Sequence, residues 1–225
     1  MCYNYNVSVV AFTTAIISGA VAIYFNQPIL GILILCYGFM QLSEAVIWKG
    51  IDTNNVNLNK TGTKIGKYTL PLHNIAIGIG IIIAYWSMRN KITTWIPLII
   101  GILFYFWILY IYSKNPDEND GETKSCTDKN TCIKGTARLQ WPYRHDWYAI
   151  SYIISMLFLF LYVKPLRSVA IATAFFTISW LVTYYLGKRN TAMQGSFWCW
   201  SAAIFVPILV IINTIITRGN PNVKS

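Results

Sequence analysis

Seven apolar stretches, each close to the length of a membrane-spanning helix, constrain this chain more than any other sequence feature. A helix needs about 20 mostly apolar residues to cross a bilayer. Charged residues make up 12% of the chain, whereas a soluble domain carries about 25%. We therefore predict one all-α domain, residues 1–225, built as a bundle of seven transmembrane helices. The predicted spans are about 7–25, 28–48, 68–88, 94–113, 147–163, 168–187 and 195–217.

The connections between the spans distribute the polar residues unevenly. Asn26-Gln27-Pro28 predicts a tight hairpin between the first two spans, because proline is favoured at the first position of a helix. An odd number of spans places the chain ends on opposite sides of the membrane. The side of Met1, here the N-terminal face, then receives the connections 49–67, 114–146 and 188–194, of which 114–146 is a long hydrophilic loop.

Two signals on the N-terminal face disagree about its orientation. Lys and Arg are more numerous there, which favours a cytoplasmic location under the positive-inside rule. Glycosylation sequons at Asn6 and Asn59 favour the opposite location. Both orientations stay open.

The net charge of +10 raises the question of the partner. Nucleic acid is a poor candidate, because no aromatic and basic platform stands clear of the predicted spans. Basic loops of a membrane protein meet anionic lipid headgroups instead. We predict an integral, multi-pass membrane protein whose partner is the lipid bilayer, and a homo-oligomer is compatible with the sequence.

Two ionisable residues fall inside the predicted spans, near the N-terminal face. Glu44 lies about one turn from the end of the second span, and His73 lies early in the third. Buried ionisable groups are costly in a membrane and face a bundle interior. Counted from the predicted ends of the spans, the two residues share one level, so we expect them to be in contact. Gln41 lies one turn from Glu44, within a stripe formed by Tyr37, Gln41, Glu44 and Trp48.

Two further residues are predicted at the same level. Cys2 precedes the first span, and Cys199 lies near the start of the last span, flanked by two tryptophans. The predicted polar pocket therefore consists of Cys2, Gln41, Glu44, His73, Trp198, Cys199 and Trp200. Cys2 with Cys199, and Cys126 with Cys132, are candidate disulfide pairs in an oxidising compartment.

The residues allow three functional interpretations. The favoured one is a non-enzymatic protein whose pocket binds, senses or passes a small molecule or ion, with Glu44 supplying charge or accepting a proton. A structural or envelope protein is the alternative, in which His73 bonds a backbone carbonyl and Glu44 reaches the headgroups. A metal- or haem-dependent enzyme is the third, using Glu44, His73 and a thiolate, or His73 and His145. No catalytic motif selects the third, so metal and cofactor stay undefined.

Three short motifs stand out at the start, in the second span and in the last span. They are Met1-Cys2-Tyr3, Met40-Gln41-Leu42-Ser43-Glu44 and Trp198-Cys199-Trp200. Together they resemble a family of uncharacterised multi-pass membrane proteins found in giant DNA viruses and some microbes, whose members begin Met-Cys-Trp-Ser and carry Met-Glu-Leu-Leu-Gln in the second helix. Here Tyr3 replaces tryptophan, and the acid and the amide are exchanged between Gln41 and Glu44. The resemblance implies no known activity, but it implies that Cys2, Gln41, Glu44 and Cys199 form one feature, in a host-cell or virion membrane.

Overall fold

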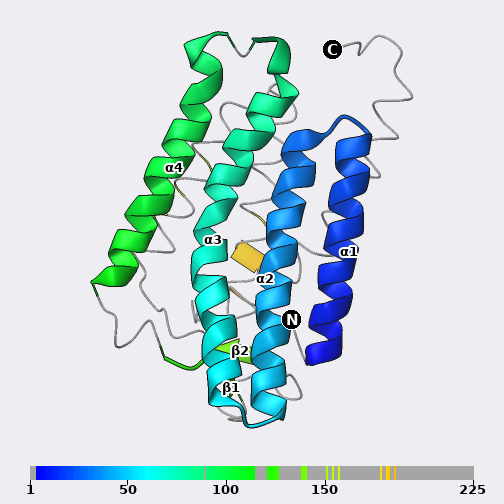
Figure 1. Cartoon of the computed structure of the whole chain (residues 1–225), viewed down its shortest axis with the longest axis vertical. Coiled ribbons are helices and arrows are strands. Elements are labelled where there is room, and N and C mark those ends of the chain that lie inside the picture. Colours follow the sequence, from blue (N-terminus) through cyan, green and yellow to red (C-terminus); the bar gives the residue numbers. More distant parts are fainter. Residues whose placement is uncertain are drawn as a thin grey trace.

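The computed structural model describes residues 4–88, 90–114, 121–126 and 138–140, together with positions 151, 154, 157, 178, 181, 182 and 185. Within these residues the chain forms four long helices and a small two-stranded sheet. Figure 1 shows that the helices run alternately up and down and that the sheet lies at one end of them. Their bounds are α1 Tyr5–Tyr24, α2 Pro28–Asp52, α3 Val56–Ala84 and α4 Ile92–Ser113, with a short 3-10 helix, η1, at Trp86–Met88. The antiparallel strands are β1 Lys124–Cys126 and β2 Arg138–Gln140.

All four helices are long enough and apolar enough to cross a membrane. They correspond to the first four predicted spans, and they indicate a membrane protein. The predicted spans 147–163, 168–187 and 195–217 lie outside the described residues, apart from single positions in the first two. The described part is therefore a four-helix portion of the predicted bundle, and the total of seven stays a prediction.

The connection between α1 and α2 is the predicted hairpin. Asn26 adopts the left-handed backbone conformation, with a φ of 57°, which asparagine tolerates better than most residues. Pro28 follows at the start of α2, where its missing N–H costs no helical hydrogen bond. Helices α1 and α2 then pack together through small residues, since Gly38 lies against Ala15.

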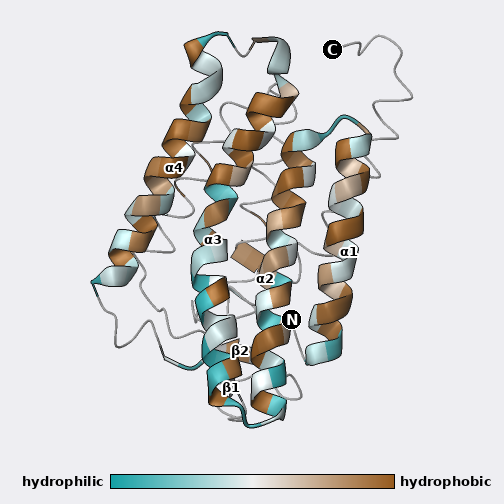
Figure 2. Cartoon of the chain, viewed as in Figure 1, coloured by the Kyte–Doolittle hydropathy of each residue, from teal (hydrophilic) through white to brown (hydrophobic). Residues whose placement is uncertain are grey.

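Helix α3 begins at Val56, well before the predicted start at residue 68. The Asn55 side chain caps it by accepting a hydrogen bond from the Leu58 backbone N–H at 3.0 Å, which satisfies a donor that the first turn leaves without a helical partner. Figure 2 shows that hydrophilic residues gather in these first turns. The segment lacks the apolar run of a membrane span, and for that reason the sequence prediction assigned it to a connection.

The first turns of α3 are helical because they pack closely on the end of α2. A Cβ atom on Gly62 would lie 2.9 Å from the Ile47 backbone nitrogen, and one on Gly50 would lie 2.5 Å from the Asn59 nitrogen. The Ser43 hydroxyl donates a hydrogen bond of 2.7 Å to the Gly62 carbonyl. Glycine on both helices therefore brings the two backbones together and fixes the register of α2 on α3.

Helix α4 packs on α3 along one side and is exposed along the other. Gly101 of α4 lies against the Asn74 carbonyl, and Gly78 of α3 lies against Leu98. Leu103, Phe106 and other large apolar side chains of α4 remain exposed within the chain. An exposed apolar surface on a helix of this length is suited to contact with lipid.

The chain after α4 returns to the end of the bundle where α2 and α3 are connected. Asn59 of α3 bonds both backbone groups of Thr123, the residue before β1. This confirms that the connections 49–67 and 114–146 meet at one face. Asn59 itself is buried, and in this fold its amide is not accessible for glycosylation, so the sequon there carries no argument about orientation.

Replacing Gly62 with valine tests the packing of α2 on α3. The larger side chain would meet the α2 backbone, and overpacking of this kind destabilises a protein by about 1–3 kcal/mol. We expect a lower midpoint of thermal unfolding in detergent. Alanine at the exposed Lys64 of the same helix leaves the free energy of unfolding within about 0.5 kcal/mol of the parent value. Equal effects of the two substitutions would contradict the close approach.

Candidate functional site

Three of the seven predicted pocket residues lie in the described part of the chain. Gln41, Glu44 and His73 are completely buried there. The other four, together with Cys132, lie outside the described residues, and of Cys126 only the backbone is described. These are Cys2, Trp198, Cys199 and Trp200. Both predicted disulfides therefore remain predictions.

His73 belongs to a packing contact between α3 and α2. Its ring meets the Tyr37 ring edge to face, with the centroids 4.4 Å apart, and it hydrogen-bonds the backbone of Cys36. An aromatic pair of this geometry contributes about 0.5–1.5 kcal/mol beyond the apolar area it buries. These contacts agree with the structural interpretation of His73, in which the ring bonds the backbone of a neighbouring helix.

Glu44 lies at a different height from His73. Tyr37 marks the level of His73, while Ser43 and Ile47 mark the level of Gly62. Because an α-helix rises 1.5 Å per residue, the seven residues from Tyr37 to Glu44 span about 10 Å along the axis. The expected common level of Glu44 and His73 is therefore wrong. It was counted from a predicted start of the third span that lies twelve residues after the true start of α3.

The predicted stripe on α2 is one buried face. Tyr37, Gln41, Glu44 and Trp48 are each at most 4% exposed. Their spacing of three and four residues places them above one another along the helix. The indole N–H of Trp48 is buried and has no hydrogen-bond partner among the described residues. Buried polar groups are almost always hydrogen-bonded, so this donor is suited to a bound water or solute next to Glu44.

Lys67 is the ionisable residue that the sequence prediction missed. It is 7% exposed, and its ammonium lies 5.7 Å from the centroid of the buried Tyr112 ring of α4, a cation–π distance. Lys67 lies five residues beyond Gly62 on α3, so it faces the level of Gln41, and its side chain extends back toward the level of Glu44. We call Gln41, Glu44, Lys67 and Tyr112 the buried polar layer.

One available signal pointed to Lys67. Asn59, Gly62, Thr63 and Gly66 recur at helical spacing and are all buried, a small and polar stripe that favours close packing between membrane helices. Extending that stripe by one residue includes Lys67. The apolar run of the predicted span begins at residue 68, and that criterion alone places Lys67 in a loop.

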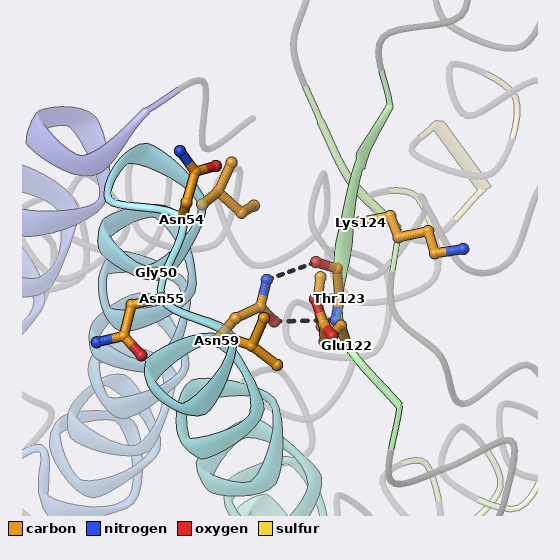
Figure 3. Close-up of a pocket in the computed structure, with 9 residues that line it drawn as sticks. Gly50, Asn54, Asn55, Asn59, Glu122, Thr123 and Lys124 are labelled. Carbon is orange, nitrogen blue, oxygen red and sulfur yellow. Dashed lines mark hydrogen bonds between the residues drawn. The ribbon is translucent and has the colours of Figure 1, made fainter.

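A pocket of about 440 Å³ opens at the same end of the bundle, where α2 ends and α3 begins (Figure 3). It is lined by none of the predicted pocket residues. Its wall includes Asn54, Asn55 and Asn59 from the helices and Glu122, Thr123 and Lys124 from the segment that leads into β1. One acidic side chain, one basic side chain and several amides therefore line the pocket, and we call it the face pocket.

The described residues contain no group of three His, Cys, Asp or Glu that could hold a metal ion. The predicted metal site needs a thiolate from Cys2 or Cys199, and the haem interpretation needs His145, all of which lie outside the described residues. Glu44 and His73, at different heights, do not supply two ligands of one ion in this structure.

Comparisons of the chain with protein-family models, with curated proteins and with solved structures found no match. The buried polar layer and the face pocket are therefore the features of the described part that bear on function.

Two double-mutant cycles test the heights of the buried groups. We expect Glu44→Gln and His73→Ala to add within about 0.5 kcal/mol in the free energy of unfolding, because the residues are about two turns apart. Glu44 and Lys67 share a level, so we expect Glu44→Gln and Lys67→Met to be coupled by about 0.5–3 kcal/mol in the free energy of unfolding. Unfolding in mixed micelles measures both cycles, and coupling in the first with additivity in the second would overturn the assignment of levels.

Proposed function

We propose that this membrane protein binds a small ion at the buried polar layer and passes it across the membrane. Glu44 is the group that supplies charge or accepts a proton, and the proton is the first candidate for the ion. The observation that carries the proposal is the burial of Glu44 and Lys67 on adjacent helices that are long and apolar enough to cross a membrane.

The free-energy cost of burying charge supports a functional role for this layer. Ionisable side chains inside membrane spans are rare, and they mark ion pathways and proton relays. A buried pair of opposite charges is often no more stabilising than apolar residues of similar volume. Packing alone therefore gives little reason for both a carboxylate and an ammonium at this level, whereas proton binding requires a group such as Glu44.

The indole donor of Trp48, which is without a hydrogen-bond partner in the described part of the chain, gives separate support. It lies one turn from Glu44 on the same face of α2. A site that binds a solute or a water chain needs polar groups that the protein itself leaves available. A small polar molecule is therefore the second candidate occupant of the layer.

A structural or envelope role without any ligand is the alternative function. The hydrogen bond from Ser43 to Gly62 and the contact of His73 with Tyr37 favour it, because both hold α2 on α3. In that case Glu44 and Lys67 fix the packing of the helices, and neutralising either of them costs stability. In the proposed function, neutralising Glu44 costs ion binding instead.

We also propose that the chain is related to the multi-pass family of giant DNA viruses and some microbes that its short motifs resemble. Of the four residues that the resemblance groups into one feature, Gln41 and Glu44 lie in the described part, and both are members of the buried polar layer. A relationship of this kind favours a host-cell or virion membrane as the location of the protein.

Proton uptake into proteoliposomes tests the proposed function. With a potassium diffusion potential as driving force and an enclosed pH-sensitive dye, we expect uptake by the parent chain and at least about a tenfold loss in Glu44→Gln, because a buried carboxylate on an ion pathway has no polar replacement. The matched control is Asp52→Asn, which neutralises an exposed carboxylate outside the face pocket and leaves uptake unchanged.

The midpoint of unfolding of the same variants separates the two functions. The proposal expects Glu44→Gln to unfold at or above the midpoint of the parent, because functional burial of a charge usually lowers stability. No uptake by the parent, together with a lower midpoint in Glu44→Gln, would leave the structural alternative in its place.

A further inference from the structure

The face pocket and the buried polar layer are connected by polar residues of α3. Asn59 lines the face pocket. Thr63 lies one turn further along the helix, and Lys67 lies one turn beyond Thr63. Side chains four residues apart lie above one another on a helix, so the three residues form one column. The column covers about 12 Å along the axis, at 1.5 Å per residue.

Thr123 closes this column at the bottom of the face pocket. The Asn59 amide donates to the Thr123 carbonyl at 2.9 Å and accepts from the Thr123 N–H at 3.0 Å (Figure 3). The hydroxyls of Thr63 and Thr123 lie 2.7 Å apart. All three residues are at most 4% exposed. We call Asn59, Thr63 and Thr123 the polar latch.

The latch is more polar than packing requires. Two threonine hydroxyls and one amide are buried together between the face pocket and Lys67, where small apolar residues would fill the same space without the cost of burying polar groups. Hydroxyls and amides that both donate and accept hydrogen bonds can exchange these partners for water. Such groups suit a path that is dry when closed and hydrated when open.

We propose that the face pocket is the aqueous mouth of an access route to the buried polar layer, and that the polar latch is its constriction. The species that uses the route is water with the hydrated proton or a small cation. Glu122 and Lys124 stand at the mouth with opposite charges, and the route ends at Lys67 and Glu44. This inference deepens the proposed function and rests on it for the identity of the ion.

Accessibility of a cysteine in the constriction tests the route without any measurement of flux. Thr63→Cys is placed in the full chain, treated in detergent with a small cationic methanethiosulfonate, and followed by mass spectrometry of the peptide that contains position 63. Adding Asn59→Ala removes both bonds to Thr123, and we expect modification to accelerate by at least about tenfold, since the closed site becomes open to water.

Two matched positions serve as controls. Cysteine at Lys64, an exposed neighbour in the sequence, reacts rapidly with or without Asn59→Ala. Cysteine at Ile81, which is buried in the apolar half of α3, reacts in neither background. Lys67→Cys provides a second reporter, one turn deeper, in case Thr63→Cys does not fold, as judged by gel filtration and thermal unfolding.

The outcomes distinguish the route from the function. Equal modification of position 63 with and without Asn59→Ala, or acceleration at position 81 to the same degree, would overturn the route. Proton uptake that depends on Glu44 while positions 63 and 67 stay unreactive in Asn59→Ala would also overturn it and leave the proposed function intact. Latch-dependent modification with no uptake by the parent would support the route and reject the proton as the ion.

Discussion

The close approach of α2 and α3 determines where every buried polar group of the described part lies. Gly50 and Gly62 leave no room for a side chain between the helices, and the Ser43 hydroxyl bonds the Gly62 carbonyl across the same contact. A shift of one helical turn would break both features. The register that they fix puts Tyr37 beside His73 and places Lys67 opposite the level of Gln41.

That register separates two kinds of polar residue within one helix pair. His73 forms contacts of the sort that hold helices together, with an aromatic ring and a backbone group of α2. Glu44 and Lys67 place two ionisable groups of opposite type in the buried part of the bundle, where a charged side chain is costly. His73 shows how a polar residue can be structural in a membrane helix. Glu44 and Lys67 are the better basis for a functional hypothesis.

The sequence was informative where apolar length and turn chemistry decide the structure. Helices α1, α2 and α4 and the hairpin at Pro28 followed from these two signals, as did the buried stripe that contains Glu44. The start of α3 did not, because Asn59, Lys60, Thr61 and Lys64 are polar and only packing on α2 makes them helical. The late predicted start of α3 also affected the predicted site. It gave His73 the same level as Glu44, and it placed Lys67 in a loop. The bonds between Asn59 and Thr123 join residues 64 positions apart, and no local pattern predicts a contact of that kind.

The length of α3 relates this protein to the thickness of the membrane around it. Its 29 residues correspond to about 43 Å, whereas the hydrocarbon core of a bilayer measures about 30 Å. If Ala84 marks one boundary of the core, Lys67 lies roughly 25 Å away, just inside the opposite boundary. Thicker and thinner bilayers, or a change of helix tilt, would then move this ammonium between hydrocarbon and headgroups. In that arrangement the thickness of the surrounding lipid sets how far the level of Lys67 lies from the headgroups, so thick and thin membranes would place the buried polar layer at different depths.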